Sequence, residues 1–168
     1  FRLVNSNNNR MTNNNCSSNN WGGISLHDSG NNRITNNRCS SNHGDGISLY
    51  ASFHNSNNNR ITDNNCSSNH GDGISLYESN SNRITDNNCS SNHENGIDIW
   101  YSNNNKITNN IASNNKYGIK LYYSSNNNIH LNNFINNTDN VYSYGYTYGS
   151  ENKWNSTEEI TYTYKGKT

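Results

Sequence analysis

Single apolar residues, separated by polar ones, return at fixed places along the chain. The clearest marker is the run NRMTNN at Asn9–Asn14, which returns four times in closely related form. Its basic residue recurs after steps of 23, 27, 23 and 23 residues, at Arg10, Arg33, Arg60, Arg83 and Lys106. A fixed period in the twenties indicates a solenoid of stacked repeats, in which one unit cannot bury its apolar face alone.

Within one repeat, the alternation of apolar and polar residues predicts three short strands. Gly73–Tyr77 alternates with period two, which places Ile74 and Leu76 inward. Arg83–Thr85 and Cys89–Ser91 follow as a second and a third short strand, each after a polar turn. Helical spacing is absent from the repeat. The pattern therefore predicts an all-β, single-stranded parallel β-helix of about six coils, each of about 23 residues with three short strands and three corners.

Repeats that stack in register place equivalent side chains about 4.8 Å apart, so each inward position becomes a column. Three aliphatic columns are predicted: Ile24, Ile47, Ile74, Ile97 and Ile119; Leu26, Leu49, Leu76, Ile99 and Leu121; and Met11, Ile34, Ile61, Ile84 and Ile107. A column of buried thiols is expected at Cys16, Cys39, Cys66 and Cys89, continued by Ala112 and Ile135. One corner predicts an asparagine ladder, in which side-chain amides pair with each other and with the backbone: Asn14, Asn37, Asn64, Asn87, Asn110 and Asn133.

Three segments depart from the repeat. Four extra residues around Ala51–Asn59 predict a longer loop after the first strand of that coil. In the last coil His130 falls on the inward Ile position, which predicts a bulge or a shift of register. From residue 138 the chain becomes rich in Tyr. We therefore expect the β-helix to occupy residues 1–137, with residues 138–168 forming a cap or the start of another module.

Composition alone would indicate disorder, because only 28% of the residues are hydrophobic and Asn is very frequent. The repeat overrides this interpretation, since the few apolar residues recur at fixed positions. The formal net charge is +0, so no field favours nucleic acid as a partner. No apolar run approaches the roughly 20 residues that a membrane-spanning helix needs, so membrane insertion by this segment is not expected.

The pattern GIxLxxSxNNxIxxNxxSxN resembles the repeat of NosD-type and carbohydrate-binding/sugar-hydrolase domains. These belong to the pectin-lyase-like superfamily and are abundant in surface proteins of methanogenic archaea. The resemblance covers roughly residues 1–137 and implies a right-handed β-helix in an extracellular or cell-surface protein. It does not specify one function, because lyases, epimerases, hydrolases, adhesins and structural proteins share this coil. The NosD name implies copper delivery, but the chain has no Met-rich or His-rich copper motif, so that role is not carried over.

The outward positions of the first strand suggest a ligand-binding surface. They predict a column of aromatic residues with polar neighbours: His27, Tyr50, Tyr77, Trp100 and Tyr122, beside Ser25, Ser48, Ser75, Asp98 and Lys120. Sugar rings have apolar faces and polar rims, so such a surface fits a polysaccharide or a glycoprotein glycan. The alternative is that Tyr and Trp are present because they stack across strands and stabilise the sheet.

Catalysis on the same face is the competing functional hypothesis. A polysaccharide lyase or epimerase needs a base beside a sugar carbon and cations that neutralise a uronate, and the candidates are Asp98, Lys120 and His93. No DPHE-type epimerase motif is present, and no Arg falls on the predicted face. A second alternative is self-assembly into a filament or surface layer through the coil ends.

A metal site is the last candidate. His43, His70 and His93 form a predicted column with Asp45 and Asp72 adjacent, and imidazole with carboxylate suits a transition ion. Copying of one ancestral repeat explains the same column, so no cofactor is predicted beyond an adventitious divalent ion. The sequence thus favours a non-catalytic extracellular β-helix that is structural and binds glycan.

Overall fold

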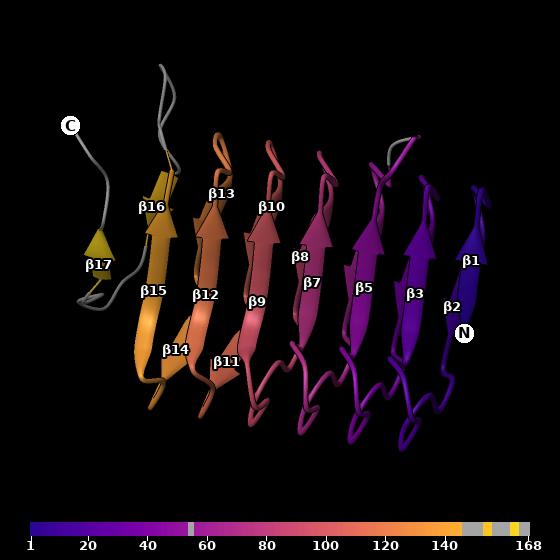
Figure 1. The fold of residues 1–168 in the computed structure, drawn as a ribbon, viewed down its shortest axis with the longest axis horizontal. Helices are drawn as coiled ribbons and strands as arrows, with labels where there is room; N and C mark the ends of the chain where they lie inside the picture. Colours follow the sequence, from indigo (N-terminus) through magenta and orange to yellow (C-terminus); the bar gives the residue numbers. More distant parts are fainter. Residues whose placement is uncertain (54–55, 146–152, 156–161, 165–168) are drawn as a thin grey trace.

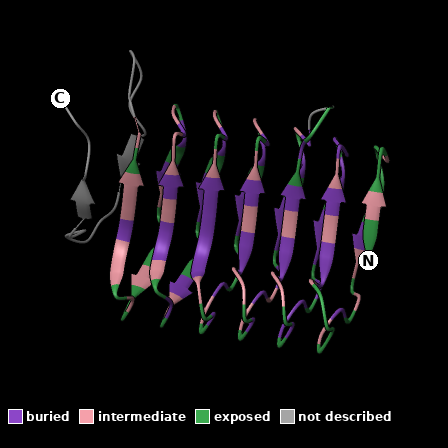
Figure 2. Ribbon diagram, viewed as in Figure 1, coloured by how far each residue is buried: buried purple, intermediate pink, exposed green. Residues whose placement is uncertain are grey.

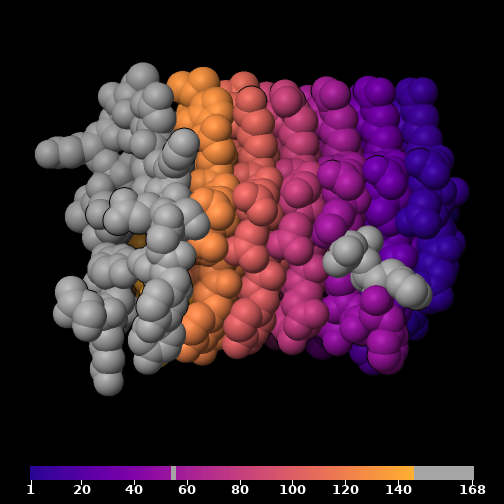
Figure 3. All heavy atoms as spheres, turned by 90° about the horizontal axis from the view of Figure 1, so that it is seen from above, coloured from indigo at the N-terminus to yellow at the C-terminus, as the bar shows by residue number. Residues whose placement is uncertain are grey.

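The computed structural model describes residues 1–53, 56–145, 153–155 and 162–164. In this part of the chain every paired strand is parallel to its neighbours, and successive coils stack along one axis (Figure 1). The predicted parallel solenoid of about six coils is confirmed. Each coil appears as a separate band across the molecular surface (Figure 3).

Two long sheets form the walls of the solenoid. The eight-stranded sheet has the order β1-β3-β5-β7-β9-β12-β15-β17 and the seven-stranded sheet the order β16-β13-β10-β8-β6-β4-β2. The first contains β1 (Arg2–Val4), β3 (Ile24–His27), β5 (Ile47–Tyr50), β7 (Ile74–Tyr77), β9 (Asn95–Trp100), β12 (Tyr117–Tyr122), β15 (Asp139–Tyr144) and β17 (Tyr162–Tyr164). The second contains β2 (Arg10–Thr12), β4 (Arg33–Thr35), β6 (Arg60–Thr62), β8 (Arg83–Thr85), β10 (Lys106–Thr108), β13 (Asn128–His130) and β16 (Lys153–Asn155).

The predicted third strand is a regular strand only near the C-terminal end. There β11 (Ile111–Ser113) pairs with β14 (Asn133–Ile135). In the earlier coils the same wall is joined by single bridge residues at Asn15, Arg38, Asn65 and Asn88. One bridge per coil suffices, because the wall is short and a corner follows on either side.

The core is a narrow seam of aliphatic side chains between the walls. The strands pair with equivalent positions opposite each other, for example Ile24 with Ile47 and Ile47 with Ile74. The predicted Ile and Leu columns are therefore buried, most of them completely (Figure 2). Each fully buried Ile or Leu stabilises the fold by roughly 1.5–3 kcal/mol, which allows so polar a chain to fold.

The polar corners are held by ladders of side-chain hydrogen bonds. At the predicted corner the amide of Asn37 donates to Asn64 Oδ1 at 3.0 Å, and that of Asn64 donates to Asn87 Oδ1 at 3.0 Å. Two further asparagine ladders and one serine ladder were not predicted from the sequence. The asparagine ladders are Asn9, Asn32, Asn59, Asn82, Asn105 and Asn127, and Asn19, Asn42, Asn69, Asn92, Asn115 and Asn137. The serine ladder has hydrogen bonds that join Ser6, Ser29 and Ser56, and others that join Ser79, Ser102 and Ser124.

Three predictions for the last coil are wrong for one reason. Asn92 bonds to Asn115, 23 residues on, whereas Asn95 pairs with Tyr117, only 22 residues on, so one residue is missing at that corner. A step of 23 therefore misplaces three positions, His130, Asn133 and Ile135, by one residue.

The corrected positions keep each column intact. Ile129, not His130, continues the inward Ile column, because Ile107 pairs with Ile129. Asn132, not Asn133, accepts the amide of Asn110 at 2.9 Å. Likewise Phe134, not Ile135, pairs with Ala112 at the continuation of the cysteine column. No bulge is needed at His130, whose Nε2 lies 3.0 Å from Thr108 Oγ1.

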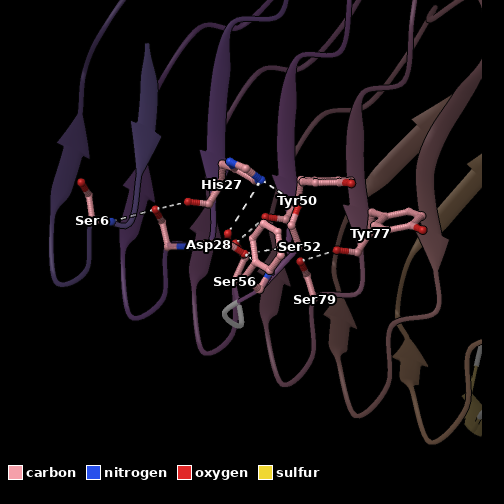
Figure 4. Close-up of polar contacts among 10 residues, drawn as sticks. Ser6, His27, Asp28, Tyr50, Ser52, Ser56, Tyr77 and Ser79 are labelled. Atoms are coloured by element: carbon pink, nitrogen blue, oxygen red, sulfur yellow. Dashed lines mark hydrogen bonds and ion pairs between the residues drawn. The ribbon is translucent and has the colours of Figure 1, made fainter.

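The extra residues of the second coil lie where a longer loop was predicted. Ser56 fills the serine-ladder position after β5, so the insertion falls between Ala51 and Ser56. Asp28 Oδ1 accepts hydrogen bonds from the backbone N–H groups of Ser52 and Phe53, at 2.7 and 3.2 Å (Figure 4).

The predicted C-terminal cap or module, residues 138–168, falls largely outside the described residues. Its first part, β15, pairs in parallel with β12 and thus continues the eight-stranded sheet. The short strands β16 and β17 pair with β13 and β15.

Candidate ligand-binding face

The outward face of the eight-stranded sheet gathers most of the predicted site residues. Along each strand the inward Ile and Leu alternate with outward residues, because side chains change face at every position. The parallel register then aligns the outward residues of successive coils. One column runs His27, Tyr50, Tyr77, Trp100, Tyr122 and Tyr144, and its neighbour runs Ser25, Ser48, Ser75, Asp98, Lys120 and Tyr142.

The aromatic column is built from stacked rings. Tyr50 and Tyr77 lie 5.0 Å apart at an interplanar angle of 20°, and Trp100 and Tyr122 lie 4.5 Å apart at 25°. Tyr122 in turn stacks on Tyr144. Rings stacked along the solenoid axis cover one another's faces and present their edges to solvent. The column therefore offers phenolic hydroxyl groups more than free ring faces.

Two turn residues that the sequence analysis did not single out widen this aromatic surface. Tyr101 and Tyr123 follow β9 and β12 in a left-handed backbone conformation, with φ of 46° and 47°, and their rings stack at 5.4 Å. Tyr101 also contacts Tyr77 and Trp100 edge-on. Bulky residues rarely adopt positive φ, so no pattern in the sequence indicated that these side chains join the column.

A groove of about 790 Å³ opens on the same face beside β3 and β5. Ser25 and Ser48 lie in it, and Trp21, Arg2 and Asp45 are among the residues that line it. Trp21 is 84% exposed. The equivalent residue in the next coil is glycine, Gly44, whose N–H donates to the Trp21 carbonyl. The sequence signal for Trp21 was this break in the repeat, which the sequence analysis did not use.

Carboxylates and one ammonium group occupy the centre of the face. Asp98 Oδ2 lies 3.6 Å from Lys120 Nζ, and Lys120 Nζ lies 5.0 Å from the centre of the Trp100 ring. Asp72 Oδ1 accepts the side-chain N–H of Asn95 at 2.8 Å, and Asp45 Oδ1 accepts the backbone N–H of Asp72 at 2.9 Å.

The carboxyl groups of this face hold their protons more tightly than ordinary Asp. Burial raises the pKa of Asp98 to about 6; Lys120 opposes the rise and Asp45 adds to it. Burial also raises the pKa of Asp72 well above its usual value, and the nearby charges of Asp98 and Asp45 contribute. Burial is the main cause of a raised pKa at Asp45 as well.

The three candidate catalytic residues do not come together. Asp98 and Lys120 form the ion pair described above, but Asp98 is only 8% exposed. His93 lines a separate groove of about 630 Å³ with His43 and His70, and its Nδ1 lies 3.6 Å from Glu94.

The histidines of that second groove are stacked. His43 and His70 lie 5.0 Å apart at 7°, and His70 and His93 lie 4.7 Å apart at 20°. Their nitrogen lone pairs therefore point along nearly parallel planes instead of converging. The predicted partners Asp45 and Asp72 do not line this groove.

The chain matches the model of a known protein family. The family described as periplasmic copper-binding protein (NosD) matches residues 1–168. The chain belongs to the NosD family. Its β-solenoid agrees with the pectin-lyase-like fold that the family resemblance implies, and the family description supports an extracytoplasmic location. Among the described residues, no helix has the length and apolar character needed to cross a membrane. No curated protein matches the chain.

The family description names copper, so the side chains of this chain that could serve as copper ligands are relevant. Copper prefers thiolate, thioether or imidazole ligands. Cys39, Cys66 and Cys89 are fully buried inside the solenoid, and burial raises the pKa of Cys66 well above its usual value. The one methionine of the chain, Met11, is also buried.

The imidazoles fit copper no better. The rings of His43, His70 and His93 lie in nearly parallel planes, so their nitrogen lone pairs do not converge on one metal ion. The residues that the structure describes contain no group of three or more His, Cys, Asp or Glu side chains able to hold a metal ion. As arranged here, the described residues do not fit a copper site.

Proposed function

We propose that this NosD-family chain is a non-catalytic module of a cell-surface protein that binds a polysaccharide or a glycoprotein glycan on the outward face of its eight-stranded sheet. The observation that carries the proposal is the groove beside β3 and β5. It combines an 84% exposed indole, Trp21, with the polar side chains of Arg2, Asp45, Ser25 and Ser48.

This combination matches the chemistry of a pyranose ring. The ring stacks its C–H face on an aromatic face while its hydroxyl groups bond to surrounding polar side chains. Trp21 offers such a face because it stands out from the surface, and a groove of about 790 Å³ has the size of an ordinary small-ligand site.

The aromatic column supplies the continuation for a longer chain. The ring centroids of the pairs Tyr50–Tyr77, Trp100–Tyr122 and Tyr122–Tyr144 lie 4.5–5.2 Å apart along the solenoid axis. Tyr50 is 43% exposed and thus available for contact. A glycan that starts at Trp21 and runs along the solenoid axis meets one ring edge per coil. We include Tyr50, Tyr77, Trp100, Tyr122 and His27 in the proposed site for this reason.

A glycan array followed by titration calorimetry with the best oligosaccharide tests the proposal. Trp21→Ala is expected to weaken binding about tenfold or more, and Trp21→Phe to restore part of it. Phe53→Ala is the matched control, because Phe53 is 88% exposed but does not line the groove. If no glycan binds, or if neither Trp21→Ala nor the double variant Tyr77→Ala/Trp100→Ala alters binding, the proposal is wrong.

A polysaccharide lyase or epimerase is the second candidate, and the Asp98–Lys120 pair is the observation that favours it. A carboxyl group with a pKa of about 6 is suited to proton transfer near neutral pH. The location of His93 in a separate groove counts against a catalytic set of His93, Asp98 and Lys120. Turnover of an oligouronate, followed by absorbance of the unsaturated product and abolished in Asp98→Asn, would decide for the enzyme.

A further inference from the structure

Strand β9 carries an unusual concentration of buried polar atoms without hydrogen-bond partners. Three of its outward residues end in a buried polar atom without a hydrogen-bond partner: Asn95 Oδ1, Asp98 Oδ1 and Trp100 Nε1. Asn95 and Asp98 are only 4% and 8% exposed. Each unpaired buried polar group costs about 1–3 kcal/mol, so a concentration of three on one strand calls for a ligand that pairs with them.

Two of these positions, Asp98 and Trp100, break the repeat. The preceding strand, β7, carries Ser75 and Tyr77 where β9 carries Asp98 and Trp100. Repetition alone explains a residue that stands in every coil, but not one that stands in a single coil. These substitutions add acceptors and a large ring at one place along the face.

The unpaired atoms of β9 are two acceptors, Asn95 Oδ1 and Asp98 Oδ1, and one donor, the indole N–H of Trp100. Asn95 uses its side-chain N–H on Asp72, so its unpaired oxygen lies on the same amide, close to the Asp72 carboxyl group. Asp98 faces Lys120 with Oδ2 and keeps Oδ1 unpaired. The charged groups around this point are Asp45, Asp72, Asp98 and Lys120; Lys116 lies 3.9 Å from Glu94.

We propose that Asp72, Asn95, Asp98 and Trp100 form a subsite for a positively charged amino-sugar unit. Its ammonium and hydroxyl groups donate to the unpaired oxygens, and the module thereby prefers amino sugars to uronates. This inference rests on the glycan-binding function proposed above and names the class of glycan.

Electrostatics support the same ligand class. The carboxyl groups of Asp72 and Asp98 have raised pKa values because they are buried near other negative charges. A cation placed among them offsets both effects, whereas a uronate adds another negative charge. In the free protein the ammonium group of Lys120 partly offsets the negative charge of Asp98.

Lys120 also covers the subsite. Its ammonium group lies beside Asp98 and over the Trp100 ring, so a ligand reaches both only when Lys120 swings aside. The Lys120 side chain is 21% exposed and ends at the surface, which allows this movement. The ligand ammonium then replaces the Lys120 ammonium as the partner of Asp98.

Because the Lys120 ammonium competes with the ligand for Asp98, two variants that break this ion pair should change the affinity for a cationic sugar in opposite directions. The probes are a glucosamine oligomer, the N-acetylglucosamine oligomer of equal length and an oligogalacturonate, titrated at near-neutral pH. Wild type is expected to bind the glucosamine oligomer about tenfold more tightly than the other two. Asp98→Asn should abolish this preference. Lys120→Ala should strengthen binding of the glucosamine oligomer several-fold, because it removes the competing cation.

Asp63→Asn is the matched control, since it removes an exposed carboxylate after β6, in the other sheet, and should leave the preference unchanged. Thermal unfolding of each variant shows that the fold is kept. Equal binding of all three oligomers, a preference for the galacturonate, or a loss of affinity in both Asp98→Asn and Lys120→Ala would overturn the inference. Binding that depends on Trp21 but ignores sugar charge leaves the glycan-binding function standing and refutes only the amino-sugar subsite. Absence of any binding refutes both.

Discussion

The asparagine ladder makes a quantitative prediction about stability, and Asn87 in the middle of the solenoid is the residue to change. Its side chain is 1% exposed and takes part in five hydrogen bonds. The amide donates to the carbonyls of Ile61 and Thr85 and to Asn110 Oδ1, at 2.9–3.0 Å. Its Oδ1 accepts the backbone and side-chain N–H groups of Asn64, each at 3.0 Å.

Asn87→Ala removes all five bonds at once. At about 1 kcal/mol net for each bond the loss is at most about 5 kcal/mol, because the two N–H groups of the amide are shared among three acceptors. The side-chain amide of Asn64 keeps its bonds to Ile34 and Thr62, which reduces the loss. We therefore expect the free energy of unfolding to fall by about 3–5 kcal/mol. Asn87→Asp keeps the shape but replaces the donor by an acceptor that faces two carbonyl groups, so it should be at least as damaging.

Urea denaturation followed by circular dichroism measures the change. The matched control is Asn88→Ala, because Asn88 is the next residue, is exposed, and should cost less than about 0.5 kcal/mol. Solenoids unfold partly coil by coil, so amide hydrogen exchange at Asn64, whose N–H loses its acceptor, gives a local measure. If Asn87→Ala and Asn88→Ala destabilise the protein equally, and exchange at Asn64 is unchanged, the ladder does not stabilise the fold.

Three further predictions follow from the interior and from the acidic face. Cys66 is fully buried with a raised pKa, so a thiol reagent should label it in the unfolded but not in the native protein, as followed by mass spectrometry. Gly73→Ala should lower the free energy of unfolding in urea by about 2–3 kcal/mol, because the added Cβ would lie 2.6 Å from the carbonyl oxygen of Gly96; wild-type stability would refute this. The pKa of Asp98 rises on folding from 3.8 to about 6, so the native state binds the proton more tightly than the unfolded state. The free energy of unfolding should therefore decrease as the pH rises from about 4 to about 6. Denaturation across this range should show a smaller decrease in Asp98→Asn than in wild type.

The stacking and the core were predictable because they follow from periodicity alone. Once the repeat aligns Ile47, Ile74 and Ile97, parallel in-register pairing is the arrangement that buries all three. The two additional asparagine ladders escaped prediction because Asn is so frequent that no single position stood out. The shift at Asn132 and Phe134 escaped it because a one-residue deletion in a corner leaves the strand patterns on both sides intact.

The candidate face was predictable only as a set of positions. The sequence placed Tyr50, Tyr77 and Trp100 on one outward column, but whether rings show faces or edges depends on rotamers that periodicity does not specify. The stacked geometry reduces the column's value as an apolar platform. Trp21, which has the exposed face, lies before the strand, where the repeat pattern carries no rule for side-chain direction.

In this fold, stacking of identical residues and binding of a ligand compete for the same side-chain groups. A residue copied into every coil pairs with its own copies above and below, and this uses the hydrogen-bonding groups or ring faces that a ligand would need. Ser29, Asn64 and Tyr77 are examples. In the proposed sites the central residues are therefore ones whose copies are missing: Trp21, which is followed by Gly44, and Asp98, which is followed by Lys120. In a solenoid of this kind, the coils that break the pattern are the places to test for binding first.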